Sequence, residues 1–573
     1  MTRKLFRTQL WLVLPGLAFL LIFFAVPVAR LLGLSVQDNA SGSLTSVHYA
    51  RIVASPVYVH VLATTFKISA TTALLSVVLG YPLAYWLAQL VEVSRRRLII
   101  LVMVPFWTSY LVKTFAWMII LGQTGLINRT VTSIGLQPLP LLNNEFAVIV
   151  GMVHAMLPLA VLTMLPVMVD IDRRLGAAAG TLGAKPGQTF WYIYFPLSMP
   201  GVAAAGLLTF ISSLGFFIVP ALLGGRKEVM LAQLVIAQVQ EMLNWSFAGA
   251  LAVMMLVSAL VICWIYDLLF GLSTLAGESS SEKPGKGLAR GFGLWLIRCV
   301  AGLTERVASF LGSALRASAT KRVLPTYSAI VILFLVVPSL LVIPIAFTSS
   351  QFLEFPPPGY SFRWFSTYLE SDVWLSATLR SFGIALATGA LATGLGGLAA
   401  LTIARSKTRW RGLIFAAFLA PMIVPRVVIA VGLFYLFAQI GLVGTDLGLV
   451  IGHTVLALPF AFVAISAVLK SYDWRLNQAA ASLGASLPKA LRLITAPIIS
   501  GGMVAAFLFA FITSFDELSV AIFISGGAKT TLPKQMWDDM ILQLNPTLAA
   551  VSAIVLLIVT SILVAANRLR RSP

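Results

Sequence analysis

Charged residues are scarce in this sequence: they make up 10% of its 573 residues, against about 25% in soluble globular proteins. Hydrophobic residues make up 59%, and the apolar runs reach the roughly 20 residues that a membrane-spanning helix needs. The runs are not the alternating segments of about 10 residues that a membrane β-barrel uses. The composition therefore excludes a soluble protein and predicts an all-α polytopic membrane protein.

Cysteine, histidine and nucleotide-binding motifs are equally sparse. The two cysteines, Cys263 and Cys299, have no spacing that predicts a disulfide framework or a zinc site, and the four histidines form no metal-binding pattern. No Gly-x-x-x-x-Gly-Lys-Ser/Thr motif for ATP occurs in the chain. We therefore expect no catalytic residue, no metal site and no cofactor bound by this chain. A membrane enzyme finds no support.

The net charge of +20 would favour nucleic acid as the partner of a soluble protein. Here the basic residues lie at helix ends, where lipid headgroups and the positive-inside rule account for them, so we expect the lipid bilayer and no nucleic acid. Arg3, Lys4 and Arg7 precede an apolar run, Leu10–Val36, that is longer than the core of a signal peptide and lacks a convincing cleavage site. We interpret it as an uncleaved first span.

One segment occurs twice without gaps, 301 positions apart. Asp172–Gly201 reads DRRLGAAAGTLGAKPGQTFWYIYFPLSMPG and Asp473–Gly502 reads DWRLNQAAASLGASLPKALRLITAPIISGG; we call them the first island and the second island. The small residues and the glycine predict a short helix, a tight turn with positive φ, and a second helix that enters the membrane. The matched positions are Asp172 and Asp473, Arg174 and Arg475, Ala178-Ala179 and Ala479-Ala480, Gly183 and Gly484, and Pro196 and Pro497.

The repeat predicts two homologous six-helix halves, about twelve transmembrane helices in all. We expect a first transmembrane half over 1–273, a cytoplasmic linker over 274–325 with an amphipathic helix at Leu288–Ala317, and a second half over 326–573. The expected spans are roughly 9–36, 59–90, 98–121, 145–168, 199–224 and 246–273, then 326–349, 375–403, 413–440, 449–470, 501–526 and 548–567.

Most of the 40 lysines and arginines fall on one side if both termini are cytoplasmic. That orientation places both islands in the cytoplasm, each between the fourth and fifth spans of its half. The loops at 37–58, 351–374, 225–245 and 527–547 then lie outside, where they could receive a partner, and the last two are long enough for a short helix or re-entrant segment. We expect a multi-pass protein of a bacterial inner membrane.

Two acidic residues, Asp516 and Glu517, lie within the eleventh expected span. Ionisable groups at membrane depth are costly and usually face a cavity or pair with one another. Neighbours on a helix point about 100° apart, so one carboxylate could face a transport path and the other a partner such as Arg426 or Lys113. An acidic path suits a cationic solute, and Trp107, Tyr110 and Trp117 could add cation–π contacts. The alternative is that either carboxylate caps or pairs structurally.

The two islands resemble the permease signature of binding-protein-dependent ABC importers. That pattern is Glu-Ala-Ala, three residues, Gly, about nine residues, then Ile-x-Leu-Pro; here it reads Gln478-Ala479-Ala480 with Gly484 and Pro497, and Ala177-Ala178-Ala179 with Gly183 and Pro196.

The resemblance implies a type I ABC importer permease fold in which each island is a coupling helix docked in a groove of a cytoplasmic ATPase. Two ATPase copies would use ATP and Mg, and a periplasmic solute-binding protein would deliver the substrate. Ala177 and Gln478 stand where the family has Glu, so any ionic contact must come from neighbours such as Asp172, Arg174, Asp473 and Arg475.

Within that family, Ser212–Gly225 and Ser514–Gly527 resemble the two subunits of spermidine/putrescine importers, fused here into one chain. This resemblance implies a polyamine or another cationic solute. Permeases for ferric iron, thiosulfate, aminophosphonate, opines or amino-acid conjugates share the architecture and stay open as alternatives. A secondary transporter of twelve spans is a further alternative, but it would not explain two repeated cytoplasmic islands.

Overall fold

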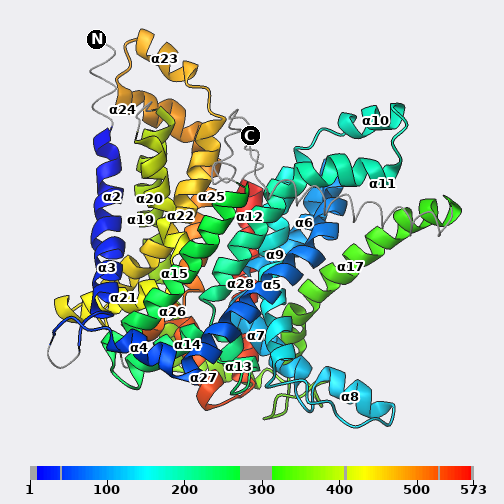
Figure 1. The fold of residues 1–573 in the computed structure, drawn as a ribbon, viewed down its shortest axis with the longest axis vertical. Helices are drawn as coiled ribbons and strands as arrows, with labels where there is room; N and C mark the ends of the chain where they lie inside the picture. Colours follow the sequence, from blue (N-terminus) through cyan, green and yellow to red (C-terminus); the bar gives the residue numbers. More distant parts are fainter. Residues whose placement is uncertain (1–9, 39–41, 271–312, 406–409, 527–528, 570–573) are drawn as a thin grey trace.

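The computed structural model describes residues 10–38, 42–270, 313–405, 410–526 and 529–569 (Figure 1). Over these ranges the chain forms helices, and the prediction of an all-α membrane protein is confirmed. Ten helices of the described residues are long and apolar enough to span a membrane, or eleven if one bent pair counts as a single span. These eleven correspond to the first eleven expected spans, and the twelfth, expected at 548–567, corresponds to α28 (Thr547–Leu569).

The helices of the bundle follow the order of the expected spans. In the first half they are α2 (Leu14–Leu20), η2 (Leu21–Ala25) and α3 (Val26–Leu34), α5 (Pro56–Gln89), α6 (Glu92–Trp107) and α7 (Tyr110–Leu121), α9 (Glu145–Val169), α12 (Phe195–Leu214) and α15 (Trp245–Phe270). In the second half they are α17 (Ser313–Ala346), α19 (Asp372–Arg405), α20 (Arg411–Ile423) and α21 (Arg426–Ile440), α22 (Asp446–Lys470), α25 (Ala496–Phe515) and α28 (Thr547–Leu569).

The sequence repeat is also a repeat of structure. From α9 to α14 equivalent helices begin 301 residues apart, as at Glu145 and Asp446 (446 − 145), but α5 and α19 begin 316 apart (372 − 56). The difference lies between α7 and α9, where the first half inserts α8 (Leu126–Ser133). Local sequence starts α9 and α22 alike: the side chains of Asn144 and Thr445, 301 apart, each accept a hydrogen bond from a backbone N–H three residues on.

The two halves exchange their first helices. α3 packs against α21 of the second half, and Gly432 comes so close to it that a Cβ would lie 3.0 Å from the Pro27 carbonyl oxygen. α17 packs against α5, α6 and α7 of the first half, and the Tyr327 hydroxyl donates to the Leu79 carbonyl at 3.0 Å. Because each half holds a helix of the other, the bundle has a shared core that neither half could form alone.

Four of the long helices are broken partway along. α12 and α25 stop and are followed by short helices, α13 (Ile218–Leu223) and α26 (Ser519–Ile524), so the spans expected at 199–224 and 501–526 are not continuous. α6 and α7 are separated at Thr108-Ser109, and α20 and α21 at Val424-Pro425, where the axis bends by 95°. The breaks of one half meet those of the other: a Cβ on Gly215 would lie 3.0 Å from the Pro425 Cβ.

The ends of the bundle differ in character. Both islands lie at one end, on opposite sides of it, and the short helices α4 (Val47–Ala54), α14 (Leu231–Gln240) and α27 (Leu532–Leu542) lie at the other (Figure 1). With α18 (Arg363–Glu370), they occupy the four loops for which the sequence predicts an outside location. The amphipathic helix expected at Leu288–Ala317 falls outside the described residues, except that α17 already begins at Ser313.

Candidate functional site

The two islands have the same backbone. α10 (Arg174–Thr181) and α23 (Arg475–Ser482) are each followed by a turn and then by α11 (Pro186–Thr189) and α24 (Leu487–Ala490). The turn glycines, Gly183 and Gly484, have φ of +86° and +83°, a conformation that favours glycine. The predicted order of short helix, glycine turn and second helix is confirmed.

The second helix of each island continues into the bundle through one wide π turn. These turns, η3 (Phe190–Tyr194) and η5 (Leu491–Thr495), lead directly into α12 and α25. Pro196 and Pro497 stand in the first turn after them, where a residue without an N–H breaks the regular helical hydrogen bonding. Each island is therefore joined to a bundle helix without a loop, so a displacement of α11 or α24 is passed on along the helix.

The two aspartates of the islands act locally. The Asp172 carboxylate accepts a hydrogen bond from the Arg174 N–H at 2.9 Å, and Asp473 accepts one from Arg475 at 3.0 Å. A carboxylate at a helix N-terminus satisfies a free N–H and interacts favourably with the helix dipole. Both aspartates and both arginines are exposed to solvent, so their charges stay available to a partner.

Each short island helix presents an exposed apolar face. Leu182 is 89% exposed and Leu483 is 88% exposed, and Leu175 and Leu476, two turns earlier, are also exposed. Ala179 and Ala480 turn inward, whereas Ala178, Ala479, Ala177 and Gln478 face outward. Leucines exposed to this degree in both copies, beside small residues, are typical of a surface that a protein partner covers.

The first island is held by aromatic side chains. Tyr85 of α5 packs edge-on against Phe190 and Tyr194, with ring centroids 5.4 and 4.8 Å apart, and Tyr81 packs against Phe195 at 5.7 Å. In addition, the Arg173 guanidinium donates to the Ala88 carbonyl at the end of α5, at 2.8 Å. Such aromatic pairs contribute roughly 0.5–1.5 kcal/mol each beyond their burial.

The second island is held by a buried polar cluster. The Tyr472 hydroxyl donates to the Asn477 side-chain oxygen at 2.6 Å, and the Asn477 amide donates to the Thr495 hydroxyl at 2.9 Å. Arg405, at the end of α19, lies over the ring of Trp474 at 5.3 Å. Both islands thus attach to the end of the second bundle helix of their half, with the cation on the island in one case and on the bundle helix in the other.

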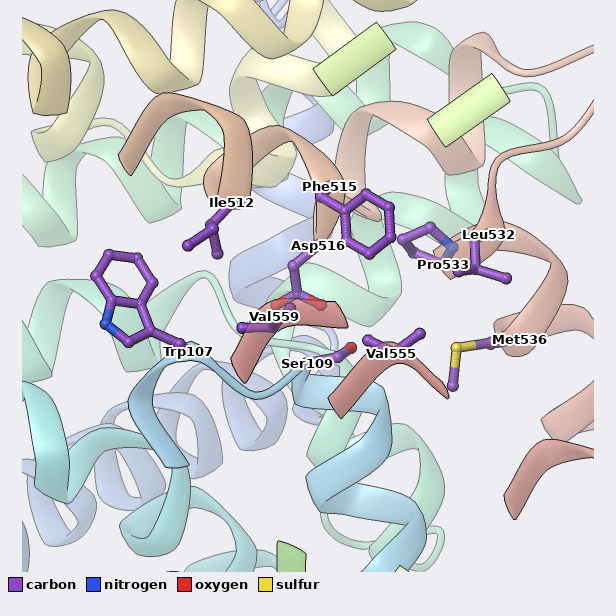
Figure 2. A pocket seen from close by; sticks show the side chains of 10 residues that line it. All are labelled: Trp107, Ser109, Ile512, Phe515, Asp516, Leu532, Pro533, Met536, Val555 and Val559. Carbon is purple, nitrogen blue, oxygen red and sulfur yellow. The ribbon is translucent and has the colours of Figure 1, made fainter. Parts of the chain in front are cut away.

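A small, mostly apolar cavity lies where the break between α6 and α7 meets the end of α25, with room for about one water molecule (about 10 Å³). The Asp516 carboxylate points into it toward Ser109, while Trp107 and Met536 lie on opposite sides (Figure 2). Asp516 accepts hydrogen bonds from the Ser109 hydroxyl and from the Tyr110 N–H, the latter at 3.4 Å. These contacts join residues about four hundred positions apart.

Glu517 points away from this cavity. It is 1% exposed, and its carboxylate accepts hydrogen bonds from the N–H groups of Val520 and Ala521 at 2.7 and 3.3 Å, which caps the N-terminus of α26. The imidazole of His453 lies 3.7 Å from the same carboxylate and contacts the Ser514 hydroxyl at 2.8 Å. Adjacent carboxylates therefore take different positions, with Asp516 at the cavity and Glu517 in the helix packing.

Two cations accompany these carboxylates. Lys113 of α7 interacts electrostatically with Asp516, and Arg426 of α21 interacts with both Asp516 and Glu517. Arg426 is the structural counterpart of Tyr110, 316 positions earlier, because each begins the second part of a broken helix. Two carboxylates and two cations therefore lie near one another in this region of the described residues, and of these four only Asp516 lines the cavity.

Of the three aromatic residues predicted for the path, two lie at the cavity or beside Asp516 and one lies away from it. Trp107 lines the cavity and packs on Phe509, with ring centroids 4.8 Å apart. Tyr110 stands beside Asp516 and packs edge-on against Phe216, the counterpart of Glu517, at 5.0 Å. Trp117 lies farther along α7 against His154, at 5.7 Å, and does not line the cavity.

Sequence reasoning missed Ser109, Met536 and His453. Ser109 could have been noticed because Thr108-Ser109 is a polar pair within an apolar run, and because Ser109 aligns with Pro425 at the offset of 316. His453 carries no such signal, since its 301-shifted counterpart is Met152. Among the described residues no group of three or more His, Cys, Asp or Glu side chains could hold a metal ion.

Two interlocked helical halves, a small cavity where their broken helices meet and two exposed islands at one end are features of a membrane transport protein. The chain belongs to the family described as "Binding-protein-dependent transport system inner membrane component", which matches residues 76–273 and 392–572. It is therefore a permease of an ABC importer and a multi-pass inner membrane protein. Separate ATPase subunits of such systems use the ATP, and the match occurs twice because two permease domains are fused.

Curated relatives align with less than half of this chain but most of their own length. The spermidine/putrescine transport system permease protein PotB of Escherichia coli (strain K12) is 31% identical over 249 residues, 42% of this chain and 90% of PotB. PotC of the same strain is 28% identical over 236 residues, 41% of this chain and 89% of PotC. PotB of Haemophilus influenzae is 29% identical over 272 residues, 46% of this chain and 95% of that protein.

Two solved structures also align with one half. A bacterial ABC transporter involved in the import of the acidic polysaccharide alginate gives a TM-score of 0.39 at 18% identity, over 44% of this chain and 92% of that chain. A bacterial alginate ABC transporter in complex with an alginate pentasaccharide-bound periplasmic protein gives 0.41 at 19% identity, over 46% of this chain and 93% of that chain.

Proposed function

We propose that this permease imports a polyamine or another small cationic solute that a periplasmic binding protein delivers. The observation that carries the proposal is the Asp516 carboxylate, which points into the cavity between the two halves beside Trp107. A carboxylate and aromatic faces are the groups that bind ammonium ions in proteins. The similarity of the chain to PotB and PotC, both spermidine/putrescine permeases, supports the same solute class.

Two ATPase copies, one under each island, would drive the proposed transport. The exposed Leu182 and Leu483, with Ala178 and Ala479 beside them, form two nearly identical apolar faces at one end of the bundle. Two equal faces suit two copies of one partner. Asp172, Arg174, Asp473 and Arg475 surround these faces and would supply the ionic contacts, because Ala177 and Gln478 have no charge.

In the proposed cycle, ATP-driven closure of the ATPases moves the two islands toward each other. Since each island continues through a π turn into α12 or α25, the motion reaches the breaks at Gly215 and Asp516 as a rigid displacement. The paired breaks would then separate on the outer side and admit the solute, and hydrolysis would reset them. Alternating access of this kind needs elements with two discrete arrangements, which broken helices provide.

The proposal includes an orientation and a domain division. With the islands in the cytoplasm, the successive spans α3, α5, α6–α7 and α9 alternate in direction so that both chain ends are cytoplasmic, and most lysines and arginines face the same side. The divisions at 273 and 325 separate the two permease halves from a cytoplasmic linker. The outer short helices α4, α14, α18 and α27 then form the surface that the binding protein meets.

Uptake of radiolabelled spermidine and putrescine into proteoliposomes, with the ATPase and binding protein of the same system, tests the proposal. We expect ATP-dependent uptake that Asp516→Asn lowers by about tenfold or more, because a charge-assisted contact contributes roughly 1.5–3 kcal/mol. Glu92→Gln, which removes an exposed carboxylate far from the cavity, serves as the control. Normal uptake by Asp516→Asn in an assembled complex would contradict the proposed path.

A second solute class is favoured by one observation, the presence of Lys113 and Arg426 beside the two carboxylates. Charges of both signs also suit a zwitterion, such as an opine or an aminophosphonate. The same proteoliposomes distinguish the classes: uptake of an opine or an aminophosphonate without uptake of polyamines would replace the polyamine assignment and leave the importer intact.

A further inference from the structure

Lys113 is the least expected charge in the bundle. It lies near the start of α7, it is 2% exposed, and its ammonium has two direct polar or π neighbours among the described residues. The ammonium donates a hydrogen bond to the Pro105 carbonyl at 3.1 Å, and it lies 4.2 Å from the centre of the Tyr110 ring. It also interacts electrostatically with Asp516. A cation at membrane depth is expensive unless such groups compensate it.

The helix break creates this environment. α6 ends at Trp107, so its last carbonyls, Pro105 among them, lack the N–H partner that a continuing helix would supply. α7 then restarts at Tyr110 and places its fourth residue, Lys113, back over the free carbonyl. An ammonium with three donors can meet a carbonyl, an aromatic face and a carboxylate together.

These three groups are also what a primary ammonium of a polyamine would need. The Pro105 carbonyl, the Tyr110 ring and the Asp516 carboxylate offer one acceptor, one π face and one counter-charge. Lys113 ends in a four-carbon amine, which has the chemistry of one end of putrescine or spermidine. Its ammonium therefore occupies the place that suits a solute ammonium.

We propose that Lys113 is a tethered cation that competes with the solute for Asp516, and that it thereby sets the affinity of the path for cationic solutes. This inference rests on the proposed function. With the path empty, the ammonium of Lys113 compensates the charge of Asp516 through space, without a direct ion pair among the described residues; a diamine or polyamine that contacts Asp516 directly displaces it. Return of Lys113 to Asp516 then expels the solute toward the cytoplasm. Lys113 is a specificity-determining residue in this scheme, in contrast to a static counter-ion that would only support packing.

Replacement of the tethered cation separates the two roles. Binding of radiolabelled spermidine to the nucleotide-free permease–ATPase complex in nanodiscs is measured for wild type, Lys113→Gln and Lys113→Arg. A competitor that is removed should leave tighter binding, so we expect Lys113→Gln to lower the half-saturating spermidine concentration about tenfold. Lys113→Arg keeps the cation and should stay near wild type. In proteoliposomes at saturating spermidine, Lys113→Gln should turn over more slowly because release loses its displacing group.

Two controls make the result specific. Lys67→Gln removes a cation of the same half that is paired with Glu145 at 2.7 Å and is largely exposed, so its binding should equal that of wild type. In a double-mutant cycle, Lys113→Gln should have no effect on spermidine binding once Asp516→Asn is present, because the shared partner is gone.

Unchanged or weaker spermidine binding by an assembled Lys113→Gln complex would overturn the inference. So would failure of both Lys113→Gln and Lys113→Met to assemble while Lys113→Arg assembles, because the charge would then be needed for the structure itself. Failure of the proposed function looks different: the wild-type system would take up neither spermidine nor putrescine, whatever residue stands at position 113.

Discussion

The first and second islands have one backbone and two different attachments. Their helices, π turns and turn glycines correspond position by position at an offset of 301, and their exposed leucines correspond as well. Beneath that surface, Tyr81, Tyr85 and Phe190 hold the first island, whereas their counterparts Gly397, Leu401 and Leu491 cannot. In the second island, hydrogen bonds among Tyr472, Asn477 and Thr495 tie α23 to η5, and Arg405 of α19 lies over Trp474.

This difference distinguishes the residues that would contact a partner from the residues that fix each island in place. The shared part is the exposed face and the turn, and the variable part is the buried contact that fixes the island to its half. Aromatic packing tolerates small shifts, whereas a buried polar cluster requires every hydrogen bond. We therefore expect the islands to respond alike to changes in the shared part and differently to changes in their attachments.

The largest effect is expected at the shared turn. Gly183→Val or Gly484→Val should reduce ATP-dependent transport by tenfold or more in either island, because a β-branched residue at this φ costs about 1–3 kcal/mol and misdirects the helix that follows. Transport and ATPase activity of the reconstituted complex check this. A Cβ at either glycine would meet nothing within 4 Å, so crowding is not the cause.

Gly501→Ala is the matched control, since Gly501 is helical, lies in the second island and also has open space around it. It should leave transport unchanged. Equal activity of Gly183→Val and wild type would show that the positive φ is not needed.

The second-largest effect is expected from a substitution that loosens the second island and leaves the first unchanged. Asn477→Ala removes the centre of the buried cluster and leaves Tyr472 and Thr495 only their mutual contact at 3.3 Å, at a cost of about 1–3 kcal/mol. We expect faster hydrogen exchange of the α23 amides with no change in α10, together with a partial loss of transport. Ser482→Ala, which removes an exposed hydroxyl of the same helix, should show neither. Equal protection of α23 in both proteins would refute the anchoring role.

A smaller effect is expected from the first attachment. Arg173→Ala removes a partly exposed hydrogen bond to the Ala88 carbonyl, worth about 1 kcal/mol after screening by solvent, while the aromatic contacts stay. Hydrogen exchange should speed up slightly in α10 and not in α23. Trp474→Ala should do the reverse, because it removes the contact with Arg405. A uniform response of both islands to either change would show that the attachments are not separate.

The smallest effect is expected where the islands depart from the family pattern. Gln478→Ala should change transport by less than about twofold, because Gln478 is exposed and the first island already has Ala177 there. Transport rates of the assembled complex decide this. A severe defect would mean that the ATPase contact at Gln478 has no counterpart in the first island.

Much of the fold follows from local sequence. The apolar runs predict helices that span the membrane because backbone groups in lipid must bond within their own segment. The repeat predicts two equivalent halves, and Gly183 and Gly484 predict their own turns, since few other residues adopt positive φ. These features depend on residues close together in the chain. The helix breaks were not predicted, because the runs that contain Gly215 and Asp516 are apolar enough on both sides to pass as continuous spans.

The candidate site depended on contacts that only the tertiary structure makes. Sequence alone identified Asp516 and Glu517 as costly charges and named Lys113 and Arg426 as possible partners, but a helix-period argument could not assign their directions. The structure assigns them because the break after Phe515 frees Glu517 to cap α26 and turns Asp516 toward Tyr110, in the other half. The physical reason is distance along the chain. The site forms where the two interlocked halves meet, and a local sequence pattern cannot predict which helix break of one half contacts which helix break of the other.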